Sequence, residues 1–458
     1  MASRTITDYQ SYVNEPDNTK LDDIPGDAGL PILGHTIPFL ADPLKWAQKQ
    51  YKKYGPVVKV NTMGMKGVLV LGPDLTQKAL LDLGGDFSSR MGFVERAGKF
   101  FGDNSLIMED FDHHKHQRRI MQGAFKVDSL KLYTEQINDI YQRAMQDWQA
   151  DAGHRISFLK HIKGLLLEVA GTVFIGIDER GEQMTKVNKA FIDCANGTIY
   201  MFPLALPGTA LYKGLKGRKF LLEYFRELLP KRRAGNGKDM LSSFCNEIDE
   251  DGNFYTDQEV MDQMIFLMFA AHDTTTAAIT HTIYYLAKHP EVKEKLYQEC
   301  KALGKDRLDY DDLDAVPYMQ QVFYEVQRLR PSAPVFPRRT IRDVQMGDTV
   351  IPAHTLILIM SRFTHHMDEY WTEPEKFDPE RFSPERSEQK QHPFLYHPFG
   401  GGAHKCIGLH FSQMEYKCFM YQFLLKYDFQ SRHKKDPHMM TLPIPKPGDG
   451  MPVELLLR

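Results

Sequence analysis

A single cysteine beside a run of glycines is the first feature whose residue types suggest chemistry. Residues 399–408 read FGGGAHKCIG, and the stretch after Cys406, IGLHFSQMEYKCFMYQFLL, has apolar residues at helical spacing. We therefore expect Cys406 at the start of a helix, where the helix dipole and free backbone N–H groups favour a thiolate. The alternative is a buried structural cysteine, which is the usual state of a free thiol.

The glycines around this cysteine have separate expected uses. Gly400 and the two glycines that follow it permit backbone angles that other residues avoid, so the loop can turn its N–H groups toward the sulfur. Gly408 would let the helix start lie close to a flat ligand, and Phe399 would cover the sulfur and exclude water. This density of glycine makes a purely structural cysteine the weaker interpretation.

A second group lies inside a long apolar segment. Thr256 and Glu259 have the spacing of a capping box, and neither Pro nor Gly follows until Pro290. A helix over this range would be roughly 50 Å long, enough to cross the whole molecule. Its first half is strongly apolar, which predicts a central, buried position.

The middle of this helix reads AAHDTTT, residues 270–276. Asp273 and Thr274 are unfavourable in an apolar helix interior unless they find partners. The small residue Ala270 comes one turn earlier and would let something large and flat approach. The functional interpretation is an acid–alcohol pair that relays protons into a buried site. The structural alternative, with about equal weight, is a threonine bonded back to its own helix beside a salt-bridged aspartate.

Two further charged groups carry weak signals when taken alone. EVQR places Glu325 and Arg328 three residues apart, on one helix face. FDPERF places Arg381 among prolines and aromatics, where it could join those two side chains in a buried cluster. Each would more often be a solvated surface pair or loop, which contributes little to stability.

The bulk composition is that of an ordinary globular protein with a sizeable core, at 458 residues, 42% hydrophobic and 26% charged. A net charge of −3 gives no electrostatic reason to expect nucleic acid as a partner. The five scattered cysteines contain no CxxC pair, which disfavours zinc ribbons and covalent CxxCH attachment and suits a reducing compartment. The polar N-terminus and the short apolar runs predict a soluble, cytoplasmic protein without a transmembrane anchor.

The pattern along the chain predicts a mainly α protein with small β-sheets, organised as one domain over 1–458. A Pro-rich, irregular segment over about 1–45 comes first. Two strands follow, VVKVNTMG and KGVLVLG, and strand-like stretches return late at DTVIPAHTLILIM and MPVELLL. The middle of the chain is helical, as in LYTEQINDIYQRAMQDW.

Taken in order, these motifs resemble the signatures of the cytochromes P-450. FGGGAHKCIG is similar to the family's haem-binding loop FxxGxRxCxG, with His404 where arginine is commonest. AAHDTT resembles the oxygen-activation motif [AG]GxDT[TS], with Ala271 in the usual glycine place. EVQR and the arginine of PERF match the remaining two signatures, and the resemblance covers essentially the whole chain. It implies the P-450 fold, with haem between the long central helix and the cysteine loop.

The resemblance also implies how the cofactor, haem b, would be held. Cys406 would be the axial thiolate ligand of the iron, which favours O–O cleavage. His114 and Arg118, from HHKHQRR, and Arg338, from VFPRRT, would bind the propionates. His404 would be the fourth donor, in a contact that is weaker than that of arginine or depends on pH.

For the reaction, the resemblance implies that Asp273 and Thr274 deliver protons during oxygen activation. Glu325, Arg328 and Arg381 would form the structural triad of the proximal side. The protein would be a monomeric haem-thiolate monooxygenase that inserts one oxygen atom from dioxygen into a C–H or double bond. A haem-thiolate isomerase, dehydratase or peroxide-driven hydroxylase stays open as the alternative, although such relatives usually lose the acid–alcohol pair. A non-catalytic haem sensor would have no use for Thr274.

Electrons would come from separate partners, a ferredoxin or flavodoxin with an NAD(P)H-dependent reductase, because the chain contains no flavin- or nicotinamide-binding fingerprint. A basic patch on the thiolate face would steer an acidic partner. Its expected members are Lys405, Lys417, Lys115 and Arg119. The alternative for any single one is a solvated helix face.

The expected substrate is a large hydrophobic small molecule, because the stretches that would line the pocket are apolar and aromatic. These stretches are 91–101, 199–208 (IYMFPLALPG), 266–270 and 333–336, together with Leu442. The pattern favours a sterol, retinoid, terpenoid or fatty-acid-like molecule. The loop at 199–208 is expected to be a mobile lid, with contact to a membrane surface as the alternative.

Overall fold

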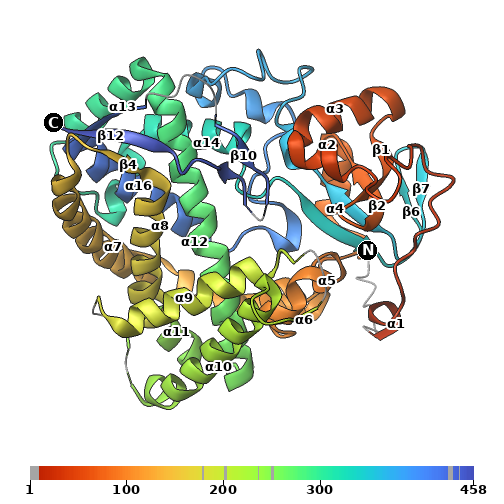
Figure 1. Cartoon of the computed structure of the whole chain (residues 1–458), viewed down its shortest axis with the longest axis horizontal. Coiled ribbons are helices and arrows are strands. Elements are labelled where there is room, and N and C mark those ends of the chain that lie inside the picture. Colours follow the sequence, from red (N-terminus) through yellow and green to blue (C-terminus); the bar gives the residue numbers. More distant parts are fainter. Residues whose placement is uncertain are drawn as a thin grey trace. The chain divides into compact units, whose positions relative to one another are not determined.

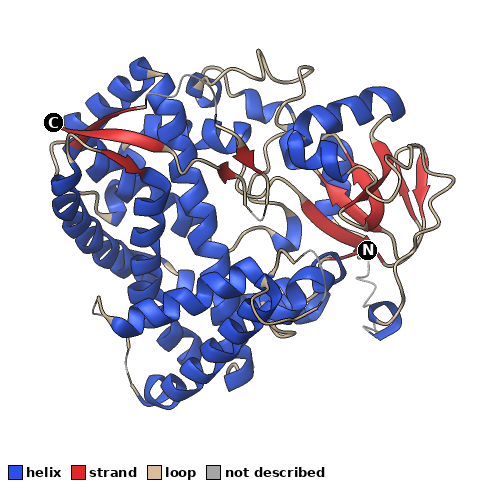
Figure 2. Ribbon diagram, in the orientation of Figure 1, coloured by secondary structure: helices blue, strands red, loops and turns tan. Residues whose placement is uncertain are grey.

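Helices account for most of the chain, and the strands are short and few (Figure 2). The computed structural model describes residues 10–177, 180–200, 204–235, 237–248, 252–431, 437–442 and 444–458. Two compact units can be distinguished. The first consists of the chain up to Gly98 with Ile107–Lys115 and Gln327–Cys406, and the second of Lys99–Leu106, His116–Val326 and Ile407–Arg458. The organisation as one catalytic domain over 1–458 stays a prediction.

The first unit contains a five-stranded sheet in the order β1-β2-β8-β5-β3. Its strands are β1 (Val57–Thr62), β2 (Met65–Val70), β3 (Phe87–Ser88), β5 (Phe336–Thr340) and β8 (Leu356–Ile359). β1 and β2 form an antiparallel hairpin, whose turn has positive φ at Met63 and Gly64. β2 and β8 pair in parallel, and the other neighbours are antiparallel. Val68 and Ile357 lie opposite each other and belong to one apolar core, whereas Leu69 and Leu358 belong to the core on the other face.

Short helices and one further hairpin complete this unit. The helices are α1 (Gln10–Val13), α2 (Thr36–Ala41), α3 (Pro43–Tyr54), α4 (Pro73–Leu81) and α15 (Ser361–Thr364), and the hairpin is β6 (Val344–Met346) with β7 (Thr349–Ile351). Asp42 caps α3 by accepting a hydrogen bond from the Lys45 N–H, and Pro43 occupies the first turn. Helices therefore begin inside the segment over about 1–45 that the sequence predicts to be irregular. Three helices include residues of both units: α5 (Arg90–Phe101), α6 (Phe111–Gln122) and α14 (Pro317–Leu329).

The second unit is mainly helical. Its helices are α7 (Val127–Asp147), α8 (Phe158–Val169), α9 (Glu182–Gly197), α10 (Ala210–Ala234), α11 (Met240–Asn246), α12 (Asp257–Lys288), α13 (Pro290–Ala302) and α16 (Leu409–Lys426). Its sheets are β4 (Arg155–Ser157), β12 (Pro452–Leu457) and β9 (Tyr427–Gln430), with β12 in the centre, and the pair β10 (Met439–Met440) and β11 (Lys446–Pro447).

Short irregular helices lie between these elements. The 3-10 helices are Leu106–Met108, Gly123–Phe125, Trp148–Asp151, Tyr310–Ala315, Pro379–Phe382, Glu388–Gln391 and Gly402–His404, and Ala170–Ile175 is a π-helical continuation of α8. The predicted strands at VVKVNTMG, KGVLVLG, DTVIPAHTLILIM and MPVELLL are confirmed, as is the helix at LYTEQINDIYQRAMQDW. None of the helices in the described ranges is long and apolar enough to cross a membrane.

The long helix predicted from Thr256 is confirmed as α12, which has 32 residues. Thr256 and Glu259 form the predicted capping box. The helix packs against α8, α10 and α16 within the second unit, and Figure 1 shows α8 running beside it. Most of its residues are buried, so the prediction of a buried helix is confirmed as well.

A carboxyl group lies in the buried contact between α16 and α12. Glu415, on α16, is 3% exposed, and its hydrogen-bonding neighbour is the hydroxyl of Thr275 on α12. Burial raises the pKa of Glu415 to about 8, and the hydrogen bond from Thr275 offsets this only in part. The side chain is therefore neutral in the folded protein at pH 7.

This pKa predicts how the stability of the protein depends on pH. The folded pKa of Glu415 lies above the value of 4.5 for a free side chain, so the unfolded chain loses the proton first. The contribution of Glu415 to stability is fully present below pH 4.5 and is lost as pH rises through the folded value. We expect Glu415→Gln to remove a slope of about 1.4 kcal/mol per pH unit in that window. Denaturant unfolding of both proteins at pH 5, 6, 7 and 8 measures it. Glu223→Gln, on the exposed side of α10, is the control, and equal slopes in all three proteins would contradict the prediction.

Candidate functional site

The loop that carries Cys406 is closed by backbone hydrogen bonds. The N–H of Cys406 donates to the carbonyl of Phe399 at 2.9 Å, which joins the two ends of the loop. Within it, the N–H of Gly400 donates to His397, and that of Lys405 to Gly402. Cys406 lies three residues before Leu409, the first residue of α16, and Gly408 is the N-cap of that helix. The predicted position at the start of a helix is therefore correct to within one turn.

Two physical reasons require glycine in this loop. Gly400 and Gly402 have φ angles of 70° and 64°, in the left-handed region that favours glycine. In addition, a Cβ atom on Gly402 would collide with the backbone carbonyl of Leu80, and one on Gly401 with the ring of Phe394. The loop thus packs directly on the C-terminal turn of α4, a contact that the sequence did not predict.

Cys406 differs from the other cysteines in its surroundings. Its side chain is exposed, whereas Cys194, Cys245, Cys300 and Cys418 are buried. Burial raises the pKa of the Cys245 thiol to about 11 and those of the other three buried thiols to about 12. These four are poor thiolates at neutral pH. The structural alternative for Cys406, a buried cysteine, is wrong.

Three of the expected propionate-binding residues lie near one another in the first unit. The rings of His114 and His404 have their centroids 3.9 Å apart and are tilted by 36°. His404 Nε2 lies 4.0 Å from the carboxylate of Asp110. The negative charge of Asp110 also acts on Arg338, which is 6% exposed on β5.

Arg338 is a buried cation with few protein partners. Its guanidinium donates to the carbonyl of Pro337 at 2.8 Å and forms no ion pair with a carboxylate of the described residues. Burial lowers the pKa of Arg338 to about 10, against the opposing charges of Asp110 and Asp82. A buried guanidinium with one carbonyl partner has room for an anionic ligand.

Asp110 is the member of this cluster that sequence reasoning missed. It is 1% exposed and accepts hydrogen bonds from the Ser88 hydroxyl at 2.5 Å and from the backbone N–H groups of Ser89 and Arg90 at 2.7 and 3.2 Å. The hydroxyl of Tyr12 donates to it as well. The carboxylate thus fixes the start of α5. Its signal in the sequence was only an aspartate before a helix.

Arg118 lies one turn after His114 on α6 and is partly buried. His114 and Arg118 have the four-residue spacing that places two side chains on one face of a helix. His114 belongs to the first unit and Arg118 to the second.

Part of one face of α12 is partly exposed, and two of its residues are alanines. Phe266, Ala270 and Thr274 follow one another at four-residue spacing and are partly exposed, as is Ala271, although most of the helix is buried. The open strip therefore spans about two turns in the middle of the helix. Phe101 packs against Phe266 and Phe269 with ring centroids 5.7 and 4.7 Å apart. The strip is apolar apart from Thr274. The flat ligand expected beside Ala270 stays a prediction.

The acid–alcohol pair has the contacts that the structural alternative predicts. The hydroxyl of Thr274 donates to the carbonyl of Ala270 at 2.6 Å. Asp273 is 8% exposed and forms an ion pair with Lys163 of α8 at 3.5 Å. These are the contacts of the two side chains at rest.

The two arginines of the expected triad are buried in the first unit and share backbone partners, and the triad with Glu325 stays a prediction. Arg328 donates to the carbonyls of His365 and Pro374, both at 2.8 Å, and Arg381 donates to Glu373 at 2.8 Å and to Thr372. Both guanidinium groups also reach the carbonyl of Lys376, at 3.2 and 3.3 Å.

Arg381 also pairs with the carboxylate of Glu388 at 3.1 Å, and sequence reasoning missed this glutamate. Glu388 also pairs with Arg386 at 2.5 Å. Glu325 is fully buried one turn before Arg328 on α14. The surface alternative for EVQR and PERF is wrong, because Glu325, Arg328 and Arg381 are each no more than 1% exposed.

The prediction that Lys417 belongs to an exposed basic patch is wrong. Lys417 is 5% exposed, and its ammonium donates to the carbonyl of Leu313 at 2.7 Å. Burial also lowers the pKa of Lys417. α16 is buried on nearly all sides, so this lysine has no open face to present. Lys405, Lys115 and Arg119 are exposed as expected.

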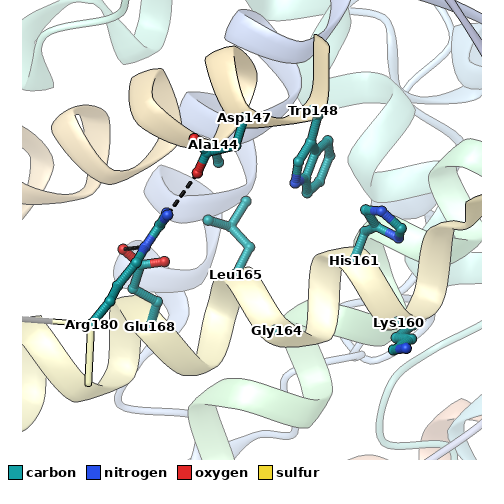
Figure 3. Close-up of a pocket in the computed structure, with 9 residues that line it drawn as sticks. All are labelled: Ala144, Asp147, Trp148, Lys160, His161, Gly164, Leu165, Glu168 and Arg180. Atoms are coloured by element: carbon teal, nitrogen blue, oxygen red, sulfur yellow. Dashed lines mark hydrogen bonds and ion pairs between the residues drawn. The ribbon is translucent and has the colours of Figure 1, made fainter. Parts of the chain in front are cut away.

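Some predicted pocket-lining residues lie outside the described residues, namely Met201, Phe202 and Pro203 of the 199–208 loop. A cavity of about 400 Å³ lies elsewhere in the second unit, on the surface between α7 and α8 (Figure 3). Its floor includes Trp148 and Leu165, and at one end Arg180 is neutralised by Asp147 and Glu168 at 2.6 and 2.8 Å. It contains none of the predicted site residues.

Comparison with known proteins gives one family. A family model described as "Cytochrome P450" matches residues 24–449. Over 444 residues the chain is 36% identical to "Putative cytochrome P450 136" of Mycobacterium tuberculosis, covering 96% of this chain and 90% of that protein. It is 29% identical to "Taxane 10-beta-hydroxylase" of Taxus cuspidata, over 95% of this chain and 90% of that protein.

A solved structure, "Retinoic acid bound cyanobacterial CYP120A1", has a TM-score of 0.86 with this chain at 27% identity, covering 95% of this chain and 99% of that one. The helix-rich architecture with small sheets is that of the same fold. The chain therefore belongs to the cytochrome P450 family of monooxygenases, which use haem b with a cysteine thiolate as axial ligand.

Proposed function

We propose that Cys406 is the thiolate ligand of the haem and that the enzyme oxygenates a large apolar, isoprenoid-like substrate. The observation that carries the first part is the contrast among the cysteines. Cys406 is the exposed one, in a loop closed by its own N–H, whereas burial raises the thiol pKa of the other four.

The residues of the first unit fit the acidic edge of a haem. Arg338 is a buried guanidinium with a single carbonyl partner, so a propionate would supply the missing negative charge. His404 and His114 would add ring N–H donors. The assignment of Arg118, on α6, to a propionate stays a prediction from the sequence. Asp110 lies 4.0 Å from Nε2 of His404 and would help to hold that ring in place.

When bound, the haem supplies the activation of dioxygen and the insertion of one oxygen atom into a C–H or double bond. The chain would position the substrate, exclude water from the site and deliver protons. Ala270 and Ala271 leave space beside α12, and Thr274 would accept a hydrogen bond and pass a proton on through its hydroxyl. Asp273 would reload that hydroxyl. Arg328 and Arg381 hold the carbonyls of residues 365–376 in place, and Glu325 would complete their triad.

The substrate proposal rests on the aromatic strip of α12 and on two relatives. Phe101, Phe266 and Phe269 form an apolar cluster beside Ala270. One relative is named for taxane hydroxylation, and the similar solved structure holds retinoic acid, and both molecules are isoprenoids. A terpenoid or retinoid is therefore the favoured substrate, ahead of a sterol or a fatty acid.

Family members need oxygen and a source of electrons. For this chain we favour a separate ferredoxin or flavodoxin with its NAD(P)H-dependent reductase. Lys405, Lys115 and Arg119 are exposed cations that suit an acidic partner.

The first test of this proposal is the spectrum of the reduced carbon monoxide complex. We expect Cys406→Ala to abolish the red-shifted band that a thiolate ligand gives. Cys245→Ala, at a buried cysteine, should keep the band. A normal-position band in the unaltered protein would contradict the assignment of Cys406.

The second test concerns Thr274. We expect Thr274→Ala to lower the product formed per NAD(P)H by a factor of up to ~100, with a matching rise in released peroxide, because a positioned proton-transfer group has been lost. Thr280→Ala is a matched control, since Thr280 makes the same kind of bond to its own helix at 2.7 Å. Unchanged coupling in Thr274→Ala would favour a peroxide-driven enzyme or a sensor.

The third test is a spin-shift titration with a retinoid, a diterpenoid, a sterol and a fatty acid. We expect the two isoprenoids to bind most tightly and Phe269→Ala to weaken them by roughly 10- to 100-fold, the effect of losing a buried aromatic contact. Phe254→Ala, at a ring that is 54% exposed, is the control. Tight binding of the fatty acid alone would contradict the proposed class.

A further inference from the structure

The carboxylate of Asp273 lies among basic side chains from three elements of the second unit. Lys163 of α8 approaches it to 3.5 Å, and His272, its neighbour on α12, to 3.4 Å. Lys446 of β11 adds a second lysine whose charge acts on the same carboxylate. α12 packs against both α8 and β11, so this grouping follows from the fold.

These groups decide the ionisation of Asp273. Burial alone would raise its pKa, but His272 and the two lysines outweigh burial, so the pKa of Asp273 is lowered. Burial lowers the pKa of His272 to about 4, which leaves its imidazole neutral at pH 7, packed against Phe191 of α9. Glu415 of α16 faces Thr275 instead. The negative charge of Asp273 is therefore balanced by lysine.

The two lysines differ in their access to water. The side chain of Lys163 is 26% exposed while its ammonium pairs with the carboxylate, so it reaches from solvent to the buried acid. Lys446 is more enclosed, and burial lowers its pKa. Because both lysines act on one carboxylate, the contact with Lys163 can open without leaving Asp273 buried and unpaired.

We propose that Lys163 is a positioning residue for proton delivery, which holds Asp273 as a carboxylate and links it to solvent on the α8 side of α12. The inference rests on the proposed role of Asp273 and Thr274. Each proton that Asp273 passes to the Thr274 hydroxyl is replaced by one from water beside Lys163. Lys163 remains an ammonium throughout, and its contact opens and closes as the carboxylate gains and loses the proton.

The experiment compares Lys163→Met and Lys163→Arg with Lys160→Met, an exposed lysine one turn earlier on α8. In Lys163→Met we expect about a tenfold fall in product per NAD(P)H, below the ~100-fold that loss of the proton-transfer group itself can cost. The solvent isotope effect on turnover should rise. Lys163→Arg should restore both, and Lys160→Met should change neither.

A second readout does not depend on turnover. Infrared difference spectra of each holoenzyme against its Asp273→Asn counterpart report the protonation of the Asp273 carboxyl. We expect the band of the protonated acid to appear at higher pH in Lys163→Met than in the unaltered enzyme, because the partner that keeps the acid ionised has gone. If Lys163→Met does not fold, Lys163→Gln takes its place.

The outcomes separate this inference from the proposed function. Loss of the thiolate band or of substrate binding in the unaltered enzyme would overturn the proposed function. An intact thiolate band with unchanged coupling and an unchanged infrared titration in Lys163→Met would overturn the inference about Lys163 alone. Equal effects in Lys160→Met would also overturn it, because they would indicate a general loss of surface charge.

Discussion

A charge that leaves water must find an opposite charge or a set of hydrogen-bond partners inside the protein, and the parts of this chain that bear on function depend on that constraint. Arg328 and Arg381 meet it with backbone carbonyls from one stretch of irregular chain and with Glu388. Asp273 meets it with lysine from another helix. The partners of Arg328 and Asp273 come from segments distant in sequence, so satisfying these charges also fixes those segments.

The buried arginines differ in how many hydrogen-bond and ion-pair partners they have. Arg381 has a carboxylate and several carbonyls, which suits a rigid structural role. Among the described residues, Arg338 donates to one carbonyl and forms no ion pair with a carboxylate. This pairing is compatible with the proposed binding of a propionate at Arg338. The number of hydrogen-bond and ion-pair partners therefore distinguishes Arg381, which suits a structural role, from Arg338, which is proposed to bind an anion.

The long-range pairings explain what the sequence predicts and what it leaves out. The capping box, the absence of breakers and the apolar periodicity are local signals, and they predict α12 correctly. Asp110 and Lys163 carry no local signal, since their partners come from distant elements. Glu388 pairs with Arg381 and Arg386 nearby in sequence, but in an irregular stretch without a periodic pattern. β3 has only two residues, too few for a periodic pattern.

Lys417 was placed on the surface because a lysine in a helix usually lies there. α16 is buried on nearly every side, and this lysine instead donates to a backbone carbonyl, that of Leu313. The error has a physical cause, because a helix that is buried all round offers no polar face from which the sequence could assign its charged residues.

The structural and functional interpretations of Thr274 are compatible. Threonine divides between two rotamers in a helix because its hydroxyl can bond to a carbonyl one turn back, and the hydroxyl of Thr274 makes that bond to Ala270. Leaving it costs about 0.5–1.5 kcal/mol, the net value of one hydrogen bond, and a single new partner offsets that amount. The ion pair of Asp273 is the larger restraint, since a buried carboxylate cannot leave one lysine unless another remains near. If Asp273 reloads the hydroxyl of Thr274, as proposed, its carboxylate would first have to be released from lysine or protonated.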